Sequence, residues 1–469
     1  MEIKFGTSGW RGIIADEFTF ERARFVTAAI ARYMVESGEA RRGVLVGHDT
    51  RFMGEDFAAD AARILSGMGL AVYLCAEPVP TPAVAYLILS RGLGGGVNFT
   101  ASHNPSNYQG IKFSTSWGGP ALPETTGRIE ELVRQYREQG LPPRSPKPGR
   151  VETVDPAPEY LARLSSIVDL GLVARSGPPV FYDALYGTGA GYLDRVLEDA
   201  GCSVTTIHGN PDPLFGGAPP EPSEGRLAQL AGIVAENKGL GLSTDGDADR
   251  FGIVGSAGEF YPPNTVLALL ADYLIRVKGV QGDLARSVAT TGLLDTIAAA
   301  HGRRCYETPV GFKYIGQMIS GDRLVMGGEE SAGMSVRGHV PEKDGILACL
   351  LVAEMVAAAG RTLSELAAEL ADRYGPRFSK RVNLPLTEEL VTGLRELLET
   401  PPREVGGQEA RDLVTIDGTK WVFDDRTWVL LRLSGTEPVA RLYVEADREE
   451  RVADLTRAFR KWISGGTNG

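Results

Sequence analysis

Three aspartates stand at alternate positions of a short turn, where their type and spacing could bind a divalent cation. They are Asp245, Asp247 and Asp249, separated by a glycine and an alanine. Carboxylate oxygens are the hard ligands that Mg²⁺ and Ca²⁺ prefer. An EF-hand would need glycine at Arg250 and a bidentate glutamate at Ser256, so that calcium module is excluded. Because crowded carboxylates repel one another unless a cation lies among them, we expect a metal site here rather than a solvated acidic turn.

A serine stands where it could carry a phosphoryl group to such a cation. Ser102 lies in the sequence Thr-Ala-Ser-His-Asn-Pro, residues 100–105, which closes an apolar, glycine-rich stretch. Mg²⁺ held by three protein oxygens commonly takes a phosphate oxygen as a further ligand. A serine in an Asn-Pro turn is often only a turn residue. The expected position of Ser102 at a strand end, like that of the acidic turn, favours a functional role.

Three further groups of polar residues lie beside glycines, where they could bind an anionic sugar. The first group could form a backbone cradle for an anion, the second could bind sugar hydroxyls, and the third could hold a phosphate through charge-assisted hydrogen bonds. They are Thr7, Ser8 and Arg11; Glu329 and Ser331; and Arg432, Ser434, Gly435 and Thr436. Taken alone, each loop could equally be an ordinary turn.

Phosphoryl transfer to or from a hydroxyl also needs a group that carries a proton. Lys112, downstream of Ser102, and His339 are the available candidates. A lysine acts as a base near neutral pH only when neighbouring positive charge, such as a metal or Arg11, lowers its pKa. Without such surroundings, Lys112 would be a surface lysine and His339 a solvated histidine.

A repeated order of elements places these loops at equivalent positions. Short apolar runs predict buried strands and amphipathic stretches predict helices, in the order β-α-β-α-β. The expected strands are 44–47, 72–74 and 96–99; 179–182, 203–206 and 240–243; and 287–289, 304–306 and 324–326. Such alternation predicts mostly parallel sheets, in which ligands bind beyond the carboxyl ends of the strands. The loops at 100–105, 244–250 and 327–333 all follow the last strand of a repeat.

The expected fold is α/β, with three similar βαβαβ-type domains, mostly parallel sheets and a C-terminal α+β domain, arranged around a central cleft. A chain of 469 residues is too long for one ordinary core. After Gly375 and Pro376 the pattern changes to α+β. The proline-rich segment 141–151 is predicted to be an interdomain linker. The predicted domains are 1–150, 151–255, 256–374 and 375–469.

Composition narrows the possible partners and surroundings. The net charge of −11, with no run of Lys or Arg, argues against a nucleic-acid surface. The sequence has no apolar stretch of about 20 residues and no signal-peptide h-region, so we expect neither a membrane partner nor export. Its four cysteines, far apart in sequence, favour reduced thiols and a cytoplasmic location. Both a monomer and a homodimer are compatible with the sequence.

Together, the loops resemble those of the α-D-phosphohexomutase family, which covers phosphoglucomutases, phosphomannomutases and phosphoglucosamine mutases. The resemblance extends from Gly6 to about Val444, with four motifs in family order and at family spacing. These motifs read Thr-Ala-Ser-His-Asn-Pro, Asp-Gly-Asp-Ala-Asp-Arg, Gly-Glu-Glu-Ser-Ala-Gly and Arg-Leu-Ser-Gly-Thr-Glu-Pro. The family form has glycine where Ala248 stands, and alanine removes no ligand.

The resemblance implies a phosphorylated Ser102, one Mg²⁺ ion as cofactor and a hexose 1,6-bisphosphate as activator. Ser102 would bind the metal together with Asp245, Asp247 and Asp249. Arg11, Lys112 as general acid/base, and His103 would act at the transferred phosphate, with His339 a further candidate. Implied substrate contacts are Arg250, Gly311, Lys313, Glu329, Ser331 and Lys343, and implied phosphate contacts are Thr7, Ser8, Arg432, Ser434, Gly435 and Thr436.

In the implied reaction, phospho-Ser102 gives its phosphoryl group to a free hydroxyl of a hexose phosphate substrate. The bisphosphate turns over in the cleft and returns its other phosphate to Ser102. A glutamate at position 330 resembles glucose-type members, whereas methionine is typical of phosphomannomutases and glutamine of phosphoglucosamine mutases. We therefore expect phosphoglucomutase activity; phosphomannomutase, phosphoglucosamine mutase and a sugar phosphatase are the alternatives. A catalytically inactive sugar-phosphate binder is disfavoured by the intact serine, aspartates and lysine.

Overall fold

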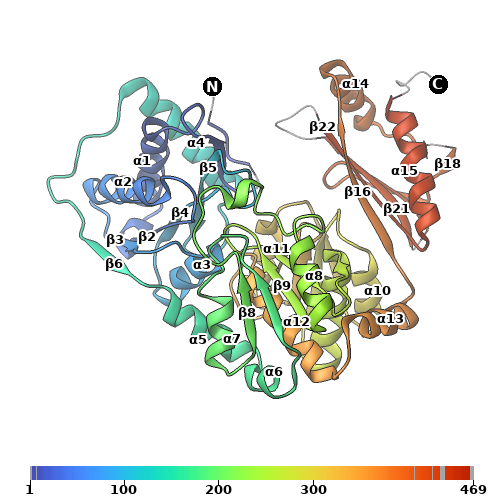
Figure 1. Cartoon of the computed structure of the whole chain (residues 1–469). Helices are drawn as coiled ribbons and strands as arrows, with labels where there is room; N and C mark the ends of the chain where they lie inside the picture. The colour runs from blue at the N-terminus through green and yellow to red at the C-terminus, as the bar shows by residue number, and fades with distance from the viewer. Residues whose placement is uncertain (1–2, 7, 406, 425, 434–438, 465–469) are drawn as a thin grey trace. The chain divides into compact units, whose positions relative to one another are not determined.

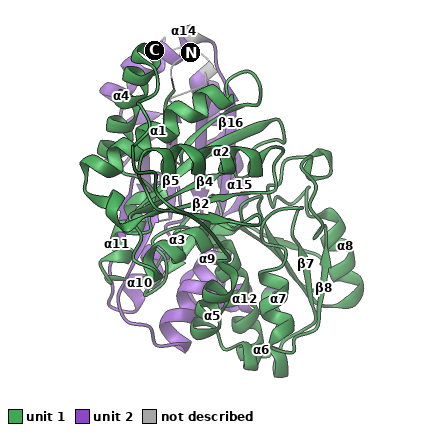
Figure 2. Ribbon diagram, turned by 90° about the vertical axis from the view of Figure 1, so that its left-hand side faces the viewer, with its two compact units in different colours: residues 1–266, 311–363 green, residues 267–310, 364–469 purple. Residues whose placement is uncertain are grey.

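The computed structural model describes residues 3–6, 8–405, 407–424, 426–433 and 439–464. The chain forms two compact units (Figure 2). Unit 1 comprises residues 1–266 and 311–363, and unit 2 comprises residues 267–310 and 364–469.

The first sheet of unit 1 positions Ser102. Its strand order is β1-β5-β4-β2-β3-β6 (Figure 1). The strands are β1 (Trp10–Ile13), β2 (Val44–His48), β3 (Val72–Cys75), β4 (Gly95–Phe99), β5 (Tyr108–Thr115) and β6 (Val151–Val154). The accompanying helices are α1 (Phe20–Glu36), η1 (Glu39–Arg42), α2 (Gly54–Gly67), α3 (Thr81–Ser90) and α4 (Pro123–Gln139). Strand β2 pairs in parallel with β3 and β4, and β3 pairs in parallel with β6, whereas β5 is antiparallel to β1 and β4.

An aromatic stack secures the end of β4. Phe57 of α2 packs against Phe99, the last residue of β4, with ring centroids 6.0 Å apart. Phe57 also contacts Phe18 and Phe20, and all three partners belong to one apolar core. Burial of aromatic side chains on this scale dominates the stability of a core. The strand end that leads to Ser102 is therefore held rigidly.

The proline-rich segment 141–151, expected to be an interdomain linker, is hydrogen-bonded to the C-terminal end of α2. Gly149 N donates to Ser66 O at 2.8 Å, and Ser145 N donates to Gly67 O at 2.7 Å. Strand β6 then pairs with β3. The expected domain boundary at residue 150 therefore cuts this sheet. The first three residues of β6 are exposed on an edge strand, which gives little apolar periodicity to detect.

The second sheet of unit 1 positions the three aspartates. Its order is β11-β10-β9-β7-β8, with β7 parallel to both β8 and β9 and with β10 antiparallel to its neighbours. The strands are β7 (Val180–Asp183), β8 (Val204–Ile207), β9 (Leu240–Thr244), β10 (Phe251–Val254) and β11 (Phe260–Tyr261). The helices are α5 (Ala157–Ile167), α6 (Leu170–Ser176), α7 (Leu193–Asp199), η2 (Phe215–Gly217) and α8 (Ala228–Asn237).

The rest of unit 1 is an antiparallel strand pair with two helices. They are α11 (Phe312–Ser320), β14 (Leu324–Glu329), β15 (Gly333–Val336) and α12 (Gly345–Ala359). Almost all of α12 is buried. In the described part of the chain, no single helix is long and apolar enough to cross a membrane. One bent helix pair passes a test of length and composition, and it includes the buried helix α12.

Unit 2 ends in an antiparallel sheet covered by helices, which confirms the expected C-terminal α+β domain. The sheet order is β16-β22-β21-β20-β19. Its strands are β16 (Phe378–Pro385), β19 (Asp412–Val414), β20 (Thr419–Asp424), β21 (Thr427–Leu433) and β22 (Val439–Ala446). The other elements of unit 2 are η3 (Tyr273–Val277), β12 (Asp283–Ser287), α10 (Leu293–Ala300), β13 (Cys305–Thr308), α14 (Glu388–Glu399), β17 (Glu404–Val405), β18 (Gln408–Glu409) and α15 (Glu449–Ser464). Helices α9 (Pro263–Asp272) and α13 (Leu363–Tyr374) begin in unit 1 and continue into unit 2. Trp421 of β20 packs edge-on against Phe459 of α15 in the core of this domain.

Candidate active site

Ser102 lies just past β4 in an unusual backbone conformation. Its φ angle is 52°, in the left-handed region that side chains other than glycine rarely adopt. Its main-chain N donates to Thr100 Oγ1 at 2.8 Å, and its Oγ donates to Asp245 Oδ2 at 2.7 Å. Only 1% of the residue is exposed. A strained, buried serine bonded to a distant carboxylate indicates a functional position rather than a simple turn.

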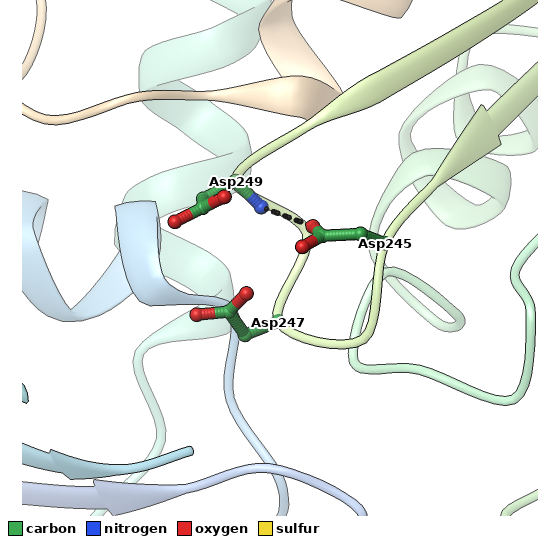
Figure 3. Close-up of side chains that lie close together, drawn as sticks. All are labelled: Asp245, Asp247 and Asp249. Carbon is green, nitrogen blue, oxygen red and sulfur yellow. Dashed lines mark hydrogen bonds between the residues drawn. The ribbon is translucent and has the colours of Figure 1, made fainter. Parts of the chain in front are cut away.

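The three aspartates converge in the turn between β9 and β10 (Figure 3). One ligand atom from each lies within 4.8 Å of the other two. Asp245 Oδ1 accepts from Asp249 N at 2.9 Å and from Arg250 N at 3.0 Å, which fixes the turn. Ala248 has a φ of 57°, which explains why glycine suits this position. The methyl group of alanine therefore adds backbone strain as well as volume.

The carboxylate oxygens fit a magnesium ion. Within the described residues, Asp247 Oδ1 and Asp249 Oδ1 are buried without a hydrogen-bond partner. Burying a carboxylate oxygen without a hydrogen-bond partner costs free energy of folding. A cation bound between the two oxygens would be a partner for both. Burial and the two neighbouring carboxylates raise the pKa of Asp245. Asp245, Asp247 and Asp249 therefore form a hard-oxygen donor set that suits Mg²⁺.

Two lysines balance the charge of this cluster. Lys112 of β5 has its Nζ 2.6 Å from Asp247 Oδ2 and 2.7 Å from Asp249 Oδ2, and Lys343 Nζ also contacts Asp249 Oδ2. Burial alone would lower the pKa of Lys112, but Asp247 and Asp249 outweigh it and raise this pKa above its ordinary value. A pKa lowered by neighbouring positive charge was the condition for Lys112 to act as a base near neutral pH, and the two carboxylates outweigh such an effect here. Lys112 carries a full positive charge beside the aspartates.

Further cations lie around the Ser102 loop. Arg11 Nη1 donates to Asn104 Oδ1 at 2.5 Å, and Arg250 Nη1 donates to Glu221 Oε1 at 3.2 Å. Burial, together with Arg250 and Arg11, lowers the pKa of His103 well below its usual value, so His103 is neutral at pH 7. Its Nδ1 is buried and has no hydrogen-bond partner among the described residues. An anion at this position would meet two arginines and a neutral imidazole.

Main-chain hydrogen bonds connect the aspartate turn to other loops of unit 1. Thr81 N donates to Asp247 O at 2.9 Å, and Thr81 Oγ1 donates to Asp247 Oδ2 at 2.5 Å. Phe251 N donates to Ala332 O at 3.2 Å, which joins β10 to the loop after Glu329. The structure therefore brings the Ser102, aspartate and glutamate loops together within one compact unit.

Glu329 is a buried acid at the end of β14. Its Oε1 accepts from Gly311 N at 2.8 Å. Ser331 lies half-buried in the following turn, and Lys313 lies in the first turn of α11, where burial lowers its pKa. Burial, with the charge of Glu330, raises the pKa of Glu329 to about 7. Near neutral pH this carboxylate is an acceptor with spare capacity, as a group that binds sugar hydroxyls must be.

We expect the substitution Glu329→Gln to stabilise the protein at pH 8 but hardly at pH 5. The pKa of Glu329 is about 7 in the folded protein, against an ordinary value of 4.5. The folded state therefore holds a proton that the unfolded state releases, and stability falls as pH rises through this window. Glutamine has no charge to bury and keeps the acceptor for Gly311 N, so the gain at pH 8 is on the order of 2 kcal/mol. Urea unfolding at both pH values measures it.

The matched control is Glu236→Gln, the same chemical change at an exposed position in α8. It is expected to leave stability unchanged at both pH values. An equal effect of Glu329→Gln at pH 5 and pH 8 would show that the carboxyl is not buried as a charge.

His339 lies in a buried hydrogen-bond network at the start of α12. Its side chain is fully buried, and its Nε2 lies 2.7 Å from Asp344 Oδ2. The same carboxylate accepts from the hydroxyl of Tyr160 at 2.7 Å, and its other oxygen caps α12 through Leu347 N. The other ring nitrogen, Nδ1, is buried and has no hydrogen-bond partner among the described residues, so a role of His339 at the transferred phosphate stays a prediction.

Four of the predicted phosphate contacts cannot be placed, and two others can. Thr7, Ser434, Gly435 and Thr436 lie outside the described residues. Ser8 is half-buried and lines a small cavity together with Lys112. In unit 2, Arg432 Nη2 donates to Asp417 Oδ2 at 2.7 Å.

The sequence interpretation missed Thr81, which bonds to Asp247, and Arg51, which contacts the Ser102 loop. The position of Arg51 could have indicated a role in the site, because Arg51 lies shortly after the end of β2 and Ser102 lies shortly after the end of β4.

Models of protein families match four successive segments of the chain. Models of the phosphoglucomutase/phosphomannomutase alpha/beta/alpha domains I, II and III match residues 2–140, 158–258 and 262–374. The model of the C-terminal domain of that family matches residues 382–461. These four matches follow one another along nearly the whole chain.

Individual relatives match over almost their full length. A phosphoglucomutase/phosphomannomutase of Thermococcus kodakarensis is 32% identical over 466 residues, covering 99% of each chain. A phosphoglucosamine/phosphogalactosamine mutase of Sulfurisphaera tokodaii is 30% identical over 469 residues, covering 98% of this chain and 99% of the relative. The crystal structure of a Thermus thermophilus protein, described as a phosphomannomutase, is 36% identical with a TM-score of 0.86, covering 99% of this chain and 100% of that one.

Proposed function

Because the chain belongs to the phosphoglucomutase/phosphomannomutase family of hexose-phosphate isomerases, we propose that it interconverts glucose 1-phosphate and glucose 6-phosphate through phosphorylated Ser102. This membership confirms the resemblance to the α-D-phosphohexomutases. The observation that carries the proposal is the 2.7 Å contact between Ser102 Oγ and Asp245, inside a cluster of three buried aspartates.

In the proposed reaction, a hydroxyl oxygen of the bound hexose phosphate attacks the phosphorus on Ser102. The bond between phosphorus and Ser102 Oγ breaks, and the new bond gives a hexose 1,6-bisphosphate. After the bisphosphate has turned over, Ser102 Oγ attacks its other phosphate. The bond between that phosphate and the sugar oxygen then breaks, which yields the isomeric monophosphate and restores phospho-Ser102.

Residues of unit 1 are suited to this transfer. Lys112, protonated beside two carboxylates, would relay protons: in the first transfer the proton of the attacking sugar hydroxyl ends on the departing Ser102 Oγ, and in the second the proton of Ser102 Oγ ends on the departing sugar oxygen. Arg11, Arg250 and neutral His103 would bind phosphate oxygens. Glu329 and Ser331 would accept and donate hydrogen bonds to sugar hydroxyls. Each of these roles is part of the proposal.

The cofactor that suits this site is Mg²⁺. Asp245, Asp247 and Asp249 would hold it, together with an oxygen of the group on Ser102. Bound there, it would neutralise negative charge on the phosphoryl group during transfer. The buried oxygens of Asp247 and Asp249 without partners support this assignment within the described residues.

The preferred sugar is the finer part of the proposal. Glu330 resembles the glucose-type form of its loop, and one relative carries both the phosphoglucomutase and the phosphomannomutase names. The name of the Sulfurisphaera tokodaii relative supports a third candidate, an amino-sugar phosphate substrate. We place glucose phosphates first and mannose phosphates next.

Coupled assays with three substrates test this order. Glucose 1-phosphate, mannose 1-phosphate and glucosamine 1-phosphate are each supplied with Mg²⁺, a trace of glucose 1,6-bisphosphate and the appropriate coupling enzyme. We expect the highest kcat/KM with glucose 1-phosphate. Faster turnover of another sugar would contradict the use of Glu330 as a specificity marker. Release of inorganic phosphate without isomerisation would favour a sugar phosphatase.

A further inference from the structure

Arg51 makes an unusually complete set of contacts in the core of unit 1. It lies shortly after β2, and its side chain is 0% exposed. Its Nε donates to Asp49 Oδ2 at 3.1 Å. Its Nη1 donates to Pro105 O at 2.7 Å and to Tyr108 O at 3.1 Å. Its Nη2 donates to Ser102 O at 2.7 Å and to Asn104 O at 2.6 Å. These contacts use all five N–H groups that an arginine side chain has.

Four of the five acceptors are main-chain carbonyls of one short segment, residues 102–108, which begins with Ser102. A guanidinium can bind them together because its donors form a rigid planar fork, whereas lysine has three donors at a single point. The ring of Phe215 covers the guanidinium, with its centroid 4.9 Å from Arg51 Cζ. Arg51 therefore fits this segment in a way that lysine does not reproduce.

The segment needs such support because its first residue is strained. Ser102 has a φ of 52°, which costs free energy in any residue with a side chain. Its carbonyl oxygen accepts a hydrogen bond from Arg51 Nη2. The same oxygen lies so close to Gly246 that a Cβ added to this glycine would be only 2.6 Å from it. The position of this carbonyl therefore sets how the serine loop meets the aspartate turn. That meeting places Ser102 Oγ 2.7 Å from Asp245.

We propose that Arg51 is a positioning residue for phosphoryl transfer, which holds the carbonyls of residues 102–108 so that Ser102 Oγ stays aligned with the aspartates. Arg51 donates all its side-chain N–H groups to protein acceptors and so acts through the loop. The inference rests on the proposed role of Ser102. A loss of alignment lowers the rate of the chemical step, whereas the groups proposed to bind the sugar are untouched.

The test compares Arg51→Lys with Arg22→Lys. Arg22 also donates to main-chain carbonyls of unit 1, those of Asp16 and Glu17, but in a different loop. We expect Arg51→Lys to lower kcat on the order of 100-fold with KM nearly unchanged. Hydrogen exchange of the amides in residues 100–108 should become about 10-fold faster. Arg22→Lys should leave kcat and this exchange as in the wild type.

Unchanged kcat and unchanged exchange in residues 100–108 of Arg51→Lys would overturn the proposal, as would a change in KM alone. If Arg51→Lys does not fold, Arg51→Gln decides, because the side-chain amide of glutamine has two N–H donors and leaves at least two of the four loop carbonyls without a partner. Faster exchange in residues 100–108 of this variant supports the proposal, and unchanged exchange overturns it. If the wild type isomerises none of the three sugars, the proposed function fails, but the exchange measurement still tests whether Arg51 holds the loop.

Discussion

Replacing Ser102 by alanine is expected to abolish isomerisation of hexose phosphates and to leave the fold intact. The phosphoryl group would have no oxygen on which to reside between the two transfers, so kcat should fall by about 10⁴-fold or more. Alanine keeps the same Cβ at the strained φ of 52° and loses one hydrogen bond, to Asp245. The free energy of unfolding should change by only about 1 kcal/mol. Coupled assays and urea unfolding measure the two effects.

Ser106→Ala is the matched control for this substitution. It removes a hydroxyl from the same loop, at a half-buried position after Pro105. We expect wild-type turnover in this variant. Wild-type turnover in Ser102→Ala would remove Ser102 from the mechanism, and loss of folding in that variant would assign the serine a structural role.

The substitution Asp247→Asn is expected to lower both the affinity for Mg²⁺ and the rate of isomerisation. Asparagine has the same shape, but it removes one of the three carboxylate charges that converge within 4.8 Å. Because even second-sphere changes at metal sites cost about 10- to 100-fold in affinity, the Mg²⁺ concentration for half-maximal activity should rise by at least about 10-fold. With less charge neutralisation, kcat should fall on the order of 100-fold even at saturating Mg²⁺. A Mg²⁺ titration of turnover, with calorimetry for binding, separates the two effects.

Asp60→Asn tests whether any buried aspartate of unit 1 would give the same result. Asp60 is buried in α2 and forms ion pairs with Arg24 and Arg63. Its replacement should lower stability and leave the Mg²⁺ dependence unchanged. An unaltered Mg²⁺ dependence in Asp247→Asn would contradict the assignment of the aspartate turn as the metal site.

Local patterns in the sequence were sufficient to predict the fold class and to identify the loops that contain Ser102 and the three aspartates. The strands expected at 72–74, 96–99 and 240–243 are β3, β4 and β9. Because the carboxyl ends of neighbouring strands tend to form one site, the order of elements alone placed the serine and aspartate loops at equivalent positions. Three alternating aspartates in a turn are likewise visible in the sequence.

Contacts between distant residues could not be predicted in this way. The bond from Thr81 to Asp247 and the ion pair between Lys343 and Asp249 depend on how strands and loops fold together. The charge state of Lys112 follows from two carboxylates far away in sequence. The sequence likewise does not show that the buried carboxylate of Asp344 binds His339. Side-chain environment, rather than residue type, decided these roles.

The central claim is that Ser102 carries the transferred phosphoryl group. The most direct measurement incubates the purified protein with glucose 1,6-bisphosphate and Mg²⁺ and then locates the modification by peptide mass spectrometry. We expect one phosphoryl group on the peptide that contains Ser102, lost when excess glucose 6-phosphate is added, and no such modification in Ser102→Ala. Phosphorylation of a different residue, or active isomerisation with Ser102 never modified, would contradict it.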